Sequence, residues 1–397
     1  MPAVFRGRLV VSPFMKLLRL VLSDLHLGTG LRPGEANTFE DFLHDEAFAD
    51  LLGHYDALLP SSDIELVLNG DIFDLLKVKI GGVWPTEITD DIACEKLRQC
   101  LDGHPRFVRA LREFMTRSSR RIVFIPGNHD LDMWMPGPQE LFRRYVAQDA
   151  AKERIHFVTQ SDTYYLPDGI QIRHGHQLER IHRVDYKKMT KTRRDGVEVL
   201  DLPWGSLWIL EVMNPAKEMR SFVDRIQPLS RFLLGAVVFD TRFLIHFLWH
   251  SSIYFLRRRV FHIGAWRERL AKLPQFVRED IISLGGWDQI ANRELARLRG
   301  VRTLILGHSH GPRFKQLPDG KLLVNTGTWM RMINLDVQHL GQDSGLTYCT
   351  IEYGGGEDGE DLPREGSQLH GAEGRPRVRL KRWLGRQKPH EVIHYAD

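Results

Sequence analysis

Aspartate, asparagine and histidine occur in five short clusters along the chain, and each cluster follows a run of apolar residues. In chain order the clusters are Asp24-Leu25-His26, Gly70-Asp71-Ile72-Phe73-Asp74, Gly127-Asn128-His129-Asp130, His174-Gly175-His176 and Gly307-His308-Ser309-His310. Each cluster alone has an ordinary explanation, because Asp-x-His pairs are common and Gly-Asn-His-Asp is a normal turn sequence. Their combination is not explained by chance, and it indicates a metal centre.

The types of ligand indicate which chemistry such a centre would serve. Carboxylate, amide and imidazole groups without thiolate favour Mn, Fe or Zn. A bridging carboxylate can hold two such ions about 3.5–4 Å apart, where they clamp a phosphate and activate water. The three cysteines, Cys94, Cys100 and Cys349, form no Cys-x-x-Cys pair, so a thiolate zinc site is not expected. So sparse a set fits a reducing compartment.

The elements that must position these clusters are short apolar runs that end in turn residues, a pattern that predicts core strands. They lie at residues 17–22, 64–68, 122–125, 170–173, 303–306 and 322–324. Helix-like stretches at 39–58 and 92–116 separate the first of them, and this alternation predicts an α/β layered fold. The clusters are therefore expected at the carboxyl ends of strands, where open α/β sheets bind ligands.

With 397 residues the chain is long enough for one core and additional segments. We expect an N-terminal extension at 1–14, a first core part at 15–190, a helical cap insertion at 191–295, a second core part at 296–353, and a tail at 354–397 that is disordered, first glycine-rich and acidic and then basic. The basic part of the tail is expected to be solvated, although it could contact anionic lipid or nucleic acid.

The expected insertion is rich in Trp, Phe, Leu and Arg, and its run 243–256 is almost entirely apolar before three arginines, 257–259. At fourteen residues the run is shorter than the about 20 that span a bilayer. Two interpretations remain open: a buried cap helix, or an acyl-lined chamber or interfacial helix with a basic edge.

The net charge and the N-terminal residues limit which partners and which cellular compartment are expected. The net charge of +4 is too small to indicate a nucleic-acid partner by itself. Residues 1–15 lack the apolar region and cleavage site of a secretory signal. We therefore expect a cytoplasmic protein, peripheral to the inner face of the membrane if the cap or tail binds lipid.

The order of the five clusters resembles the signature of the calcineurin-like metallophosphoesterases, which runs Asp-x-His, Gly-Asp-x-x-Asp, Gly-Asn-His-Asp, His-Gly and Gly-His-x-His. The resemblance covers about 15–180 and 301–353 and leaves the cap and tail outside. It implies a four-layer α/β/β/α sandwich that hydrolyses a phosphate ester or anhydride bond. It also implies two divalent metal ions, with Mn foremost and Fe or Zn as alternatives.

Carried over onto this sequence, the resemblance implies a role for each cluster residue. The implied metal ligands are Asp24, His26 and His310 for the first ion, Asp71 as the bridge, and Asn128, His174 and His308 for the second ion. His129 would be the catalytic histidine, which contacts the phosphoryl group and protonates the leaving oxygen, and Asp74 would orient it. His176 is expected beside the ligands rather than on a metal, and Asp130 is expected to brace its turn.

Three strings are further similar to UDP-2,3-diacylglucosamine hydrolases, which cleave a pyrophosphate in lipid A synthesis and enclose acyl chains under a helical cap. They are residues 23–27, residues 69–74 and the late segment Asn325-Thr326-Gly327-Thr328-Trp329. Leu75-Leu76 stands where Ser/Thr phosphatases of this superfamily have Arg-Gly, which disfavours a protein phosphatase. The typical proteobacterial lipid A enzyme has Arg at the position of His129 and is shorter. A UDP-sugar lipid is thus the leading hypothesis among phosphorylated substrates.

Two alternatives remain. A nuclease of the same superfamily would need a basic groove with interleaved aromatic residues. Basic residues occur at 187–194, 257–259 and 267, but the long apolar residues between them fit lipid better than bases, so nucleic acid is the less favoured partner. A non-catalytic metal-binding scaffold would be expected to have lost ligands, whereas all seven and His129 are present.

Overall fold

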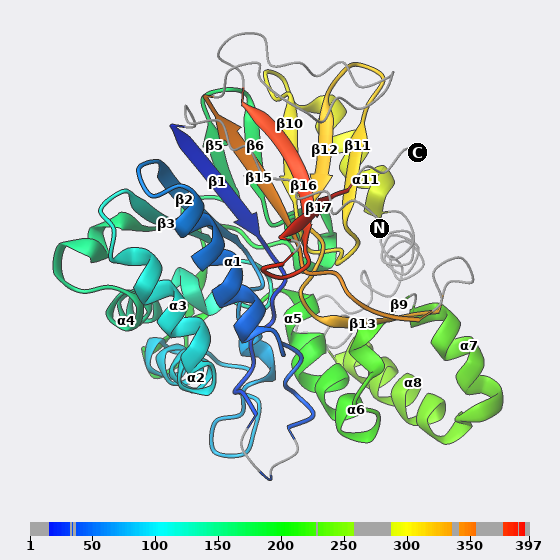
Figure 1. Cartoon of the computed structure of the whole chain (residues 1–397). Coiled ribbons are helices and arrows are strands. Elements are labelled where there is room, and N and C mark those ends of the chain that lie inside the picture. The colour runs from blue at the N-terminus through cyan, green and yellow to red at the C-terminus, as the bar shows by residue number, and fades with distance from the viewer. Residues whose placement is uncertain are drawn as a thin grey trace.

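A computed structural model describes residues 16–31, 34, 37–227, 229–257, 287–335, 341–354, 376–387 and 389–393. Two β-sheets lie at its centre, and helices cover their outer faces (Figure 1). The expected N-terminal extension and residues 355–375 of the expected tail lie outside the described residues.

The first sheet has seven strands in the order β17-β16-β15-β1-β2-β3-β4. The strands are β1 (Leu17–Leu22), β2 (Asp63–Asn69), β3 (Arg120–Ile125), β4 (Ile155–Phe157), β15 (Thr347–Tyr353), β16 (Arg377–Trp383) and β17 (His390–Val392). β1 to β4 run parallel, and β15 to β17 are added antiparallel. Along β1, Leu18, Leu20 and Leu22 face one side and Val21 the other, which is the two-residue period of a strand.

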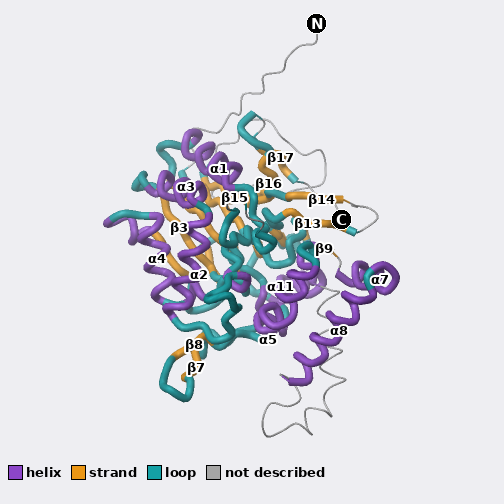
Figure 2. Tube along the Cα trace, turned by 90° about the horizontal axis from the view of Figure 1, so that it is seen from below, coloured by secondary structure: helices purple, strands orange, loops and turns teal. Residues whose placement is uncertain are grey.

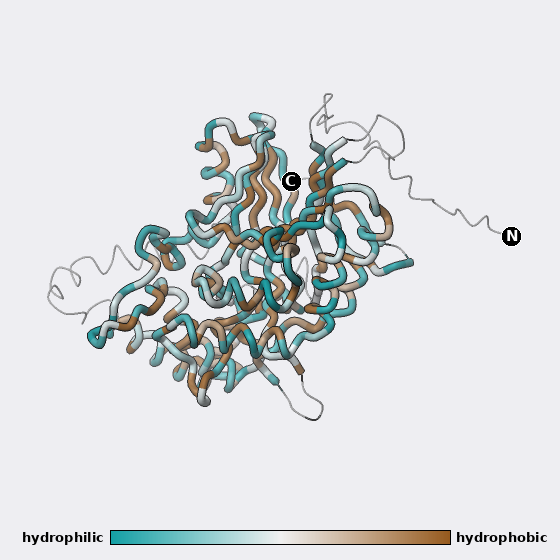
Figure 3. Tube along the Cα trace, turned by 90° about the vertical axis from the view of Figure 1, so that its left-hand side faces the viewer, coloured by the Kyte–Doolittle hydropathy of each residue, from teal (hydrophilic) through white to brown (hydrophobic). Residues whose placement is uncertain are grey.

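The second sheet has five strands in the order β11-β12-β10-β6-β5. They are β5 (Thr163–Leu166), β6 (Ile170–Arg173), β10 (Thr303–Leu306), β11 (Arg313–Gln316) and β12 (Leu322–Asn325). Ile172, Ile305 and Val324 from this sheet share one buried apolar cluster with Val21 and Val67 from the first. The two sheets therefore pack face to face, and the apolar colour runs along their strands in Figure 3.

Helices form the two outer layers. Those on the first sheet are α1 (Asp45–Leu58), α2 (Asp90–Gly103), α3 (Pro105–Met115) and α4 (Pro136–Val146), and Phe48 and Phe107 share one buried apolar cluster with Leu20 of the sheet. α11 (Trp287–Arg297) covers the second sheet through Ala291 and Leu295. This α/β/β/α layering confirms the predicted fold class.

Two predicted helices differ from the observed ones for local reasons. The first begins at Asp45 because the buried carboxylate of Glu40 accepts hydrogen bonds from the backbone N–H groups of Gly30 and Phe42, which holds the preceding segment as a loop. The second is divided into α2 and α3 because Pro105 has no N–H to continue a helix and instead starts the next one.

The expected insertion is described over 191–227, 229–257 and 287–295. Its elements are strand β8 (Glu198–Leu200), which pairs with β7 (Thr190–Thr192), then α5 (Trp204–Trp208), the π-helical turn Ile209–Met213, α6 (Asn214–Met219), the 3₁₀ turn Val223–Arg225, β9 (Ile226–Gln227), α7 (Leu229–Phe239) and α8 (Thr241–Phe255). β9 joins β13 (Arg331–Asn334) and β14 (Gly341–Ser344) in a three-stranded sheet. Figures 1 and 2 place α7 and α8 at the periphery, away from α1 to α4.

The run 243–256, for which a buried and an interfacial helix were both open, forms most of α8 and has two apolar faces. Phe243, Phe247 and Tyr254 belong to a second buried core together with Leu76, which lies two residues after the second Asp cluster. Ile245 and Trp249 point outward and are 64% exposed. No helix in the described part of the chain is long and apolar enough to cross a membrane.

The structure corrects the prediction for the basic end of the tail. It was expected to be solvated, but Arg377–Trp383 is strand β16, paired antiparallel with β15. Leu380 is fully buried between the two sheets, and the ammonium of Lys381 lies 3.0 Å from Glu352 Oε1. Leu380, Trp383 and the paired Lys381 are buried and hold a strand whose other side chains are largely basic.

Leu380→Ala should lower the free energy of unfolding by about 2–5 kcal/mol, because it removes buried methyl groups from a site that is closed on both sides. Leu384→Ala, four residues later and 43% exposed, is the matched control and should change it by less than about 0.5 kcal/mol. Urea denaturation followed by circular dichroism measures both. Equal effects would mean that β16 is not part of the core.

Candidate metal centre

The predicted ligands lie on loops at the ends of β1, β2, β3, β6 and β10, and five of them have an unusual backbone conformation. Of seven non-glycine residues with positive φ in the described chain, five are predicted ligands: Asp24, His26, Asp71, His308 and His310, with φ between 52° and 69°. Aspartate and histidine adopt this conformation at a cost, and such residues cluster at functional sites. The loops therefore hold these side chains in a geometry that local preferences alone would not select.

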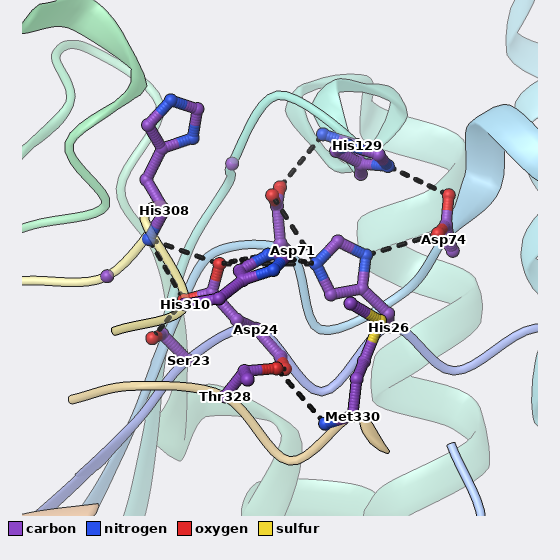
Figure 4. A network of polar contacts seen from close by, with 12 residues as sticks. Ser23, Asp24, His26, Asp71, Asp74, His129, His308, His310, Thr328 and Met330 are labelled. Atoms are coloured by element: carbon purple, nitrogen blue, oxygen red, sulfur yellow. Dashed lines mark hydrogen bonds and ion pairs between the residues drawn. The ribbon is translucent and has the colours of Figure 1, made fainter. Parts of the chain in front are cut away.

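The first group contains Asp24, His26 and His310, whose ligand atoms all lie within 4.8 Å of one another (Figure 4). His310 Nε2 is 3.2 Å from His26 Nε2 and 3.4 Å from Asp24 Oδ1. His26 Nδ1 lies 3.1 Å from Asp74 Oδ2, which leaves Nε2 as the nitrogen that faces the group. One carboxylate and two imidazoles converging in this way can bind a divalent ion.

The second group contains Asp71, His174 and His308. His174 Nδ1 donates a hydrogen bond to the backbone oxygen of Asn69 at 2.9 Å, and its Nε2 points to Asp71 Oδ2 at 3.1 Å. Asp71 Oδ2 is also 3.9 Å from His26 Nε2, so this carboxylate lies between the two groups. Its burial would raise the pKa of Asp71, but His174 and His129 hold that pKa well below its usual value.

Two buried atoms, one on Asn128 and one on His174, show whether the predicted ligands fit metal ions. Both residues are almost fully buried. Asn128 Oδ1 has no hydrogen-bond partner in the described part of the chain, and His174 Nε2 faces Asp71 Oδ2 at 3.1 Å with no aligned hydrogen bond between them. A buried polar atom without a partner costs about 1–3 kcal/mol, and native structures usually satisfy it with water or an ion. The donor set and these two atoms fit divalent cations.

His129 and Asp74 form a pair beside the first group. His129 Nδ1 is 2.9 Å from Asp74 Oδ1, and the imidazole is 17% exposed, so it can be reached from outside. Burial would lower the pKa of His129, but Asp74 and Asp71 raise it to about 9. The pair can thus hold an imidazolium next to the metal-type ligands.

His176 and Asp130 take the supporting positions that were expected of them. The ring of His176 is fully buried, with its centroid 5.5 Å from that of His174. Burial, and then the positive charge of His174, lower the pKa of His176 well below its usual value, so it remains neutral. Asp130 accepts backbone hydrogen bonds from Gly127 at 2.6 Å and from Ile72 at 2.8 Å, which ties the second and third clusters together.

Two further contributions come from residues with no recognised role in the motifs. Glu179 Oε2 is 3.2 Å from His308 Nε2, and His182 lies 3.7 Å from the same carboxylate oxygen. A carboxylate on one ring nitrogen orients the imidazole and leaves the other nitrogen for a metal. The segment 325–329, which resembles one in UDP-2,3-diacylglucosamine hydrolases, also supports the first group. Thr328 Oγ1 donates a hydrogen bond to the backbone oxygen of Asp24 at 2.7 Å (Figure 4).

Gly127→Ala should weaken metal binding by about 10–100-fold. A Cβ at this position would lie 2.2 Å from Asp71 Oδ1, so the carboxylate between the two groups would have to move. Gly53→Ala is the control, because a Cβ there meets no atom within 4 Å. Isothermal titration with Mn²⁺ measures both variants, and unchanged affinity in Gly127→Ala would contradict the position assigned to Asp71.

A sequence model of the calcineurin-like phosphoesterases matches residues 18–235. No curated protein matches the sequence. A dimetal phosphatase from Danio rerio aligns with 86% of this chain and 96% of its own, at 10% identity and a TM-score of 0.33. A 5′-nucleotidase from Candida albicans aligns with 85% of this chain and 51% of its own, at 12% identity and a TM-score of 0.24, so the alignment spans about half of that protein.

The family match carries the conclusion, since it covers more than half of the chain and includes four of the five clusters. The structure brings the fifth cluster, with His308 and His310, to the same place. The chain belongs to the calcineurin-like phosphoesterase family and is a phosphoester hydrolase.

Proposed function

We propose that this protein hydrolyses phosphoester or pyrophosphate bonds at a centre of two divalent metal ions. The observation that carries the proposal is the position of Asp71 between the two ligand groups, 3.1 Å from His174 and 3.9 Å from His26. Asp24, His26 and His310 would hold one ion, Asn128, His174 and His308 the other, and Asp71 would bridge them. Mn is the preferred ion, with Fe or Zn as alternatives for the same ligands.

The chain's own residues would supply the proton and the orientation. Two divalent ions in these groups would polarise the phosphoryl oxygens and lower the pKa of water to near neutrality. His129 would stabilise the transferring phosphoryl group and donate a proton to the leaving oxygen. Asp74 accepts the Nδ1 proton of His129, so the other ring nitrogen is left for the substrate.

A lipid nucleotide of the UDP-2,3-diacylglucosamine type is our proposed substrate. Support comes from the motif strings and from the insertion, whose apolar core includes Leu76, two residues after the second cluster. The alternative is a phosphodiesterase or nuclease. Two of the basic residues that favoured a nuclease are paired with acids, since Lys191 lies 3.0 Å from Asp201 and Arg193 lies 3.0 Å from Glu87, which reduces their attraction for phosphates.

Hydrolysis of a substrate panel tests this function. The panel is UDP-2,3-diacylglucosamine, bis(p-nitrophenyl) phosphate, ADP-ribose and single-stranded DNA, each with Mn²⁺ and with chelator. We expect metal-dependent cleavage of the lipid nucleotide, a loss of about 10²–10⁴-fold in kcat for His129→Ala, and loss of metal binding for Asp71→Ala. Cleavage of the diester or DNA alone would reject the lipid substrate. No turnover by metal-loaded protein would leave a non-catalytic metal-binding scaffold.

The outer face of α7 and α8 supports a location at the inner face of the cytoplasmic membrane, where a lipid substrate would be found. Eight of the fourteen exposed large hydrophobic residues in the described chain lie on α7, on α8 or directly after α8: Leu234, Val237, Val238, Phe239, Ile245, Leu248, Trp249 and Leu256. Exposed Arg242 and Arg257 flank them. Apolar area next to cationic side chains is the combination that binds interfacial helices to anionic lipid.

Flotation with phosphatidylglycerol vesicles tests this location. Leu248→Ser with Trp249→Ser should lower the vesicle-bound fraction by at least about tenfold, since each side chain contributes about 1.5–3 kcal/mol when buried in lipid. Leu43→Ser with Val83→Ser, which are 51% and 63% exposed elsewhere, is the matched control. A wild-type protein that stays unbound with anionic vesicles would reject the membrane location.

A further inference from the structure

A cluster of buried charged residues lies outside the two ligand groups and is built from both the core and the insertion. Its members are Asp41, Lys77, Lys217 and Asp224. The ammonium of Lys77 lies 2.5 Å from Asp41 Oδ2 and 2.7 Å from Asp224 Oδ2. The ammonium of Lys217 lies 2.6 Å and 2.7 Å from the same two oxygens. Lys217 is fully buried, and the side chains of Asp41 and Lys77 are 1% and 5% exposed.

This cluster touches the proposed active site through one contact. Lys77 Nζ lies 2.8 Å from Asp74 Oδ2, one helical turn earlier in the chain. The other oxygen of Asp74 holds His129 at 2.9 Å. A continuous path of ion pairs therefore runs from Asp224 through Lys77 and Asp74 to the imidazole of His129.

The insertion supplies three of the charged groups at this junction. The core supplies two carboxylates, Asp41 and Asp74, and one ammonium, Lys77. The insertion adds Asp224 and Lys217, and also Arg225, whose Nε lies 3.5 Å from Asp41 Oδ1. Buried charges need close partners, because an uncompensated one costs about 3–5 kcal/mol. Two more contacts fix the same junction: Asn214 Nδ2 donates to the backbone oxygen of Leu76 at 2.9 Å, and Lys79 pairs with Glu218 at 2.6 Å.

We propose that Lys77, held in place by Asp224 and Lys217 of the insertion, is a positioning residue that fixes Asp74 and thereby the proton-donating orientation of His129. The inference rests on the role proposed above for His129. It makes residues 214–225 part of the catalytic arrangement rather than only a cover over the substrate. Lys77 does not touch substrate, and its effect passes through Asp74.

The dependence of the rate on the leaving group shows whether Lys77 positions His129 or only stabilises the fold. A general acid matters most for leaving groups that are poor without a proton and little for good ones. Misplacing His129 should therefore lower kcat for poor leaving groups only, with KM unchanged. General destabilisation of the fold would lower the rates of all substrates together.

The experiment uses aryl esters of uridine 5′-phosphate, with leaving groups from p-nitrophenol to unsubstituted phenol, and the full-length Mn²⁺-loaded protein. The main variant is Lys217→Met with Asp224→Leu, because replacing a buried ion pair by apolar residues of similar size is often neutral for stability. Lys77→Met removes the link itself, and Lys77→Arg restores a cation. The matched control is Lys79→Met with Glu218→Gln, which breaks the neighbouring pair that does not reach Asp74.

The main variant and Lys77→Met are compared with the wild type at saturating Mn²⁺, because Asp74 Oδ2 also lies 3.1 Å from the proposed metal ligand His26. They should lose about tenfold in kcat with phenol and less than about twofold with p-nitrophenol. Lys77→Arg should recover part of the loss, and the control should match the wild type. A second readout needs no turnover: the Nδ1 proton of His129, identified in zinc-loaded protein by its absence in His129→Ala, should exchange with water faster in both variants.

The alternatives give different results. An unchanged leaving-group dependence and unchanged proton exchange in folded Lys77→Met would overturn the inference and leave the proposed function intact. A wild-type protein that cleaves none of the esters, or a His129→Ala variant with unchanged leaving-group dependence, would instead contradict the role of His129. If the main variant does not fold, Lys77→Met and Lys77→Arg decide the question.

Discussion

The burial of several carboxylates in one place is the constraint on which the rest of the structure depends. Asp24, Asp71 and Asp74 are each no more than 1% exposed, and they converge where the ends of the two sheets meet. Carboxylates in so dry a region repel one another and lose their hydration, so they persist only with cationic partners and backbone donors. The left-handed loops and the donors that surround Asp130 can be understood as the means of holding them there. In the calcineurin-like family this accumulated negative charge is what two metal ions would balance.

The sequence predicted the layers well because they depend on local periodicity. In β1 the alternation of Leu18, Leu20 and Leu22 with Val21 identifies both the strand and the two faces that it must cover. Strand β16 was missed because its stability comes from its neighbour. Leu380 is buried in the core between the sheets with Val378 packed against it, and Lys381 becomes compatible with burial through Glu352, a partner on another strand. A local sequence pattern does not reveal a partner on another strand.

The residues of the candidate site likewise divide into those that the sequence predicted and those that it did not. Metal-type ligands follow strands directly and keep short fixed spacings, so Asp24, Asp71 and His308 could be named from the sequence. Glu179 and Lys217 could not be, because an acidic or basic residue in a helical or loop segment is normally solvated, and its burial depends on packing between distant segments. The one signal available was the spacing of Asp74 and Lys77, three residues apart, which places them on neighbouring turns.

The insertion presents different chemistry on its two sides, and this has a consequence for how the enzyme can vary. Its outward face on α7 and α8 is apolar and tolerates exchange of one large side chain for another, since Phe239 and Trp249 pack against little of the described chain. Its inward face carries Lys217 and Asp224 at fixed distances from Lys77, and a buried charge tolerates no such exchange unless its partner changes with it. Changes that leave the docking of the insertion intact are therefore expected on the outward face. The inward face constrains the insertion to one way of docking on the core, because the same residues neutralise Asp41 and support Asp74.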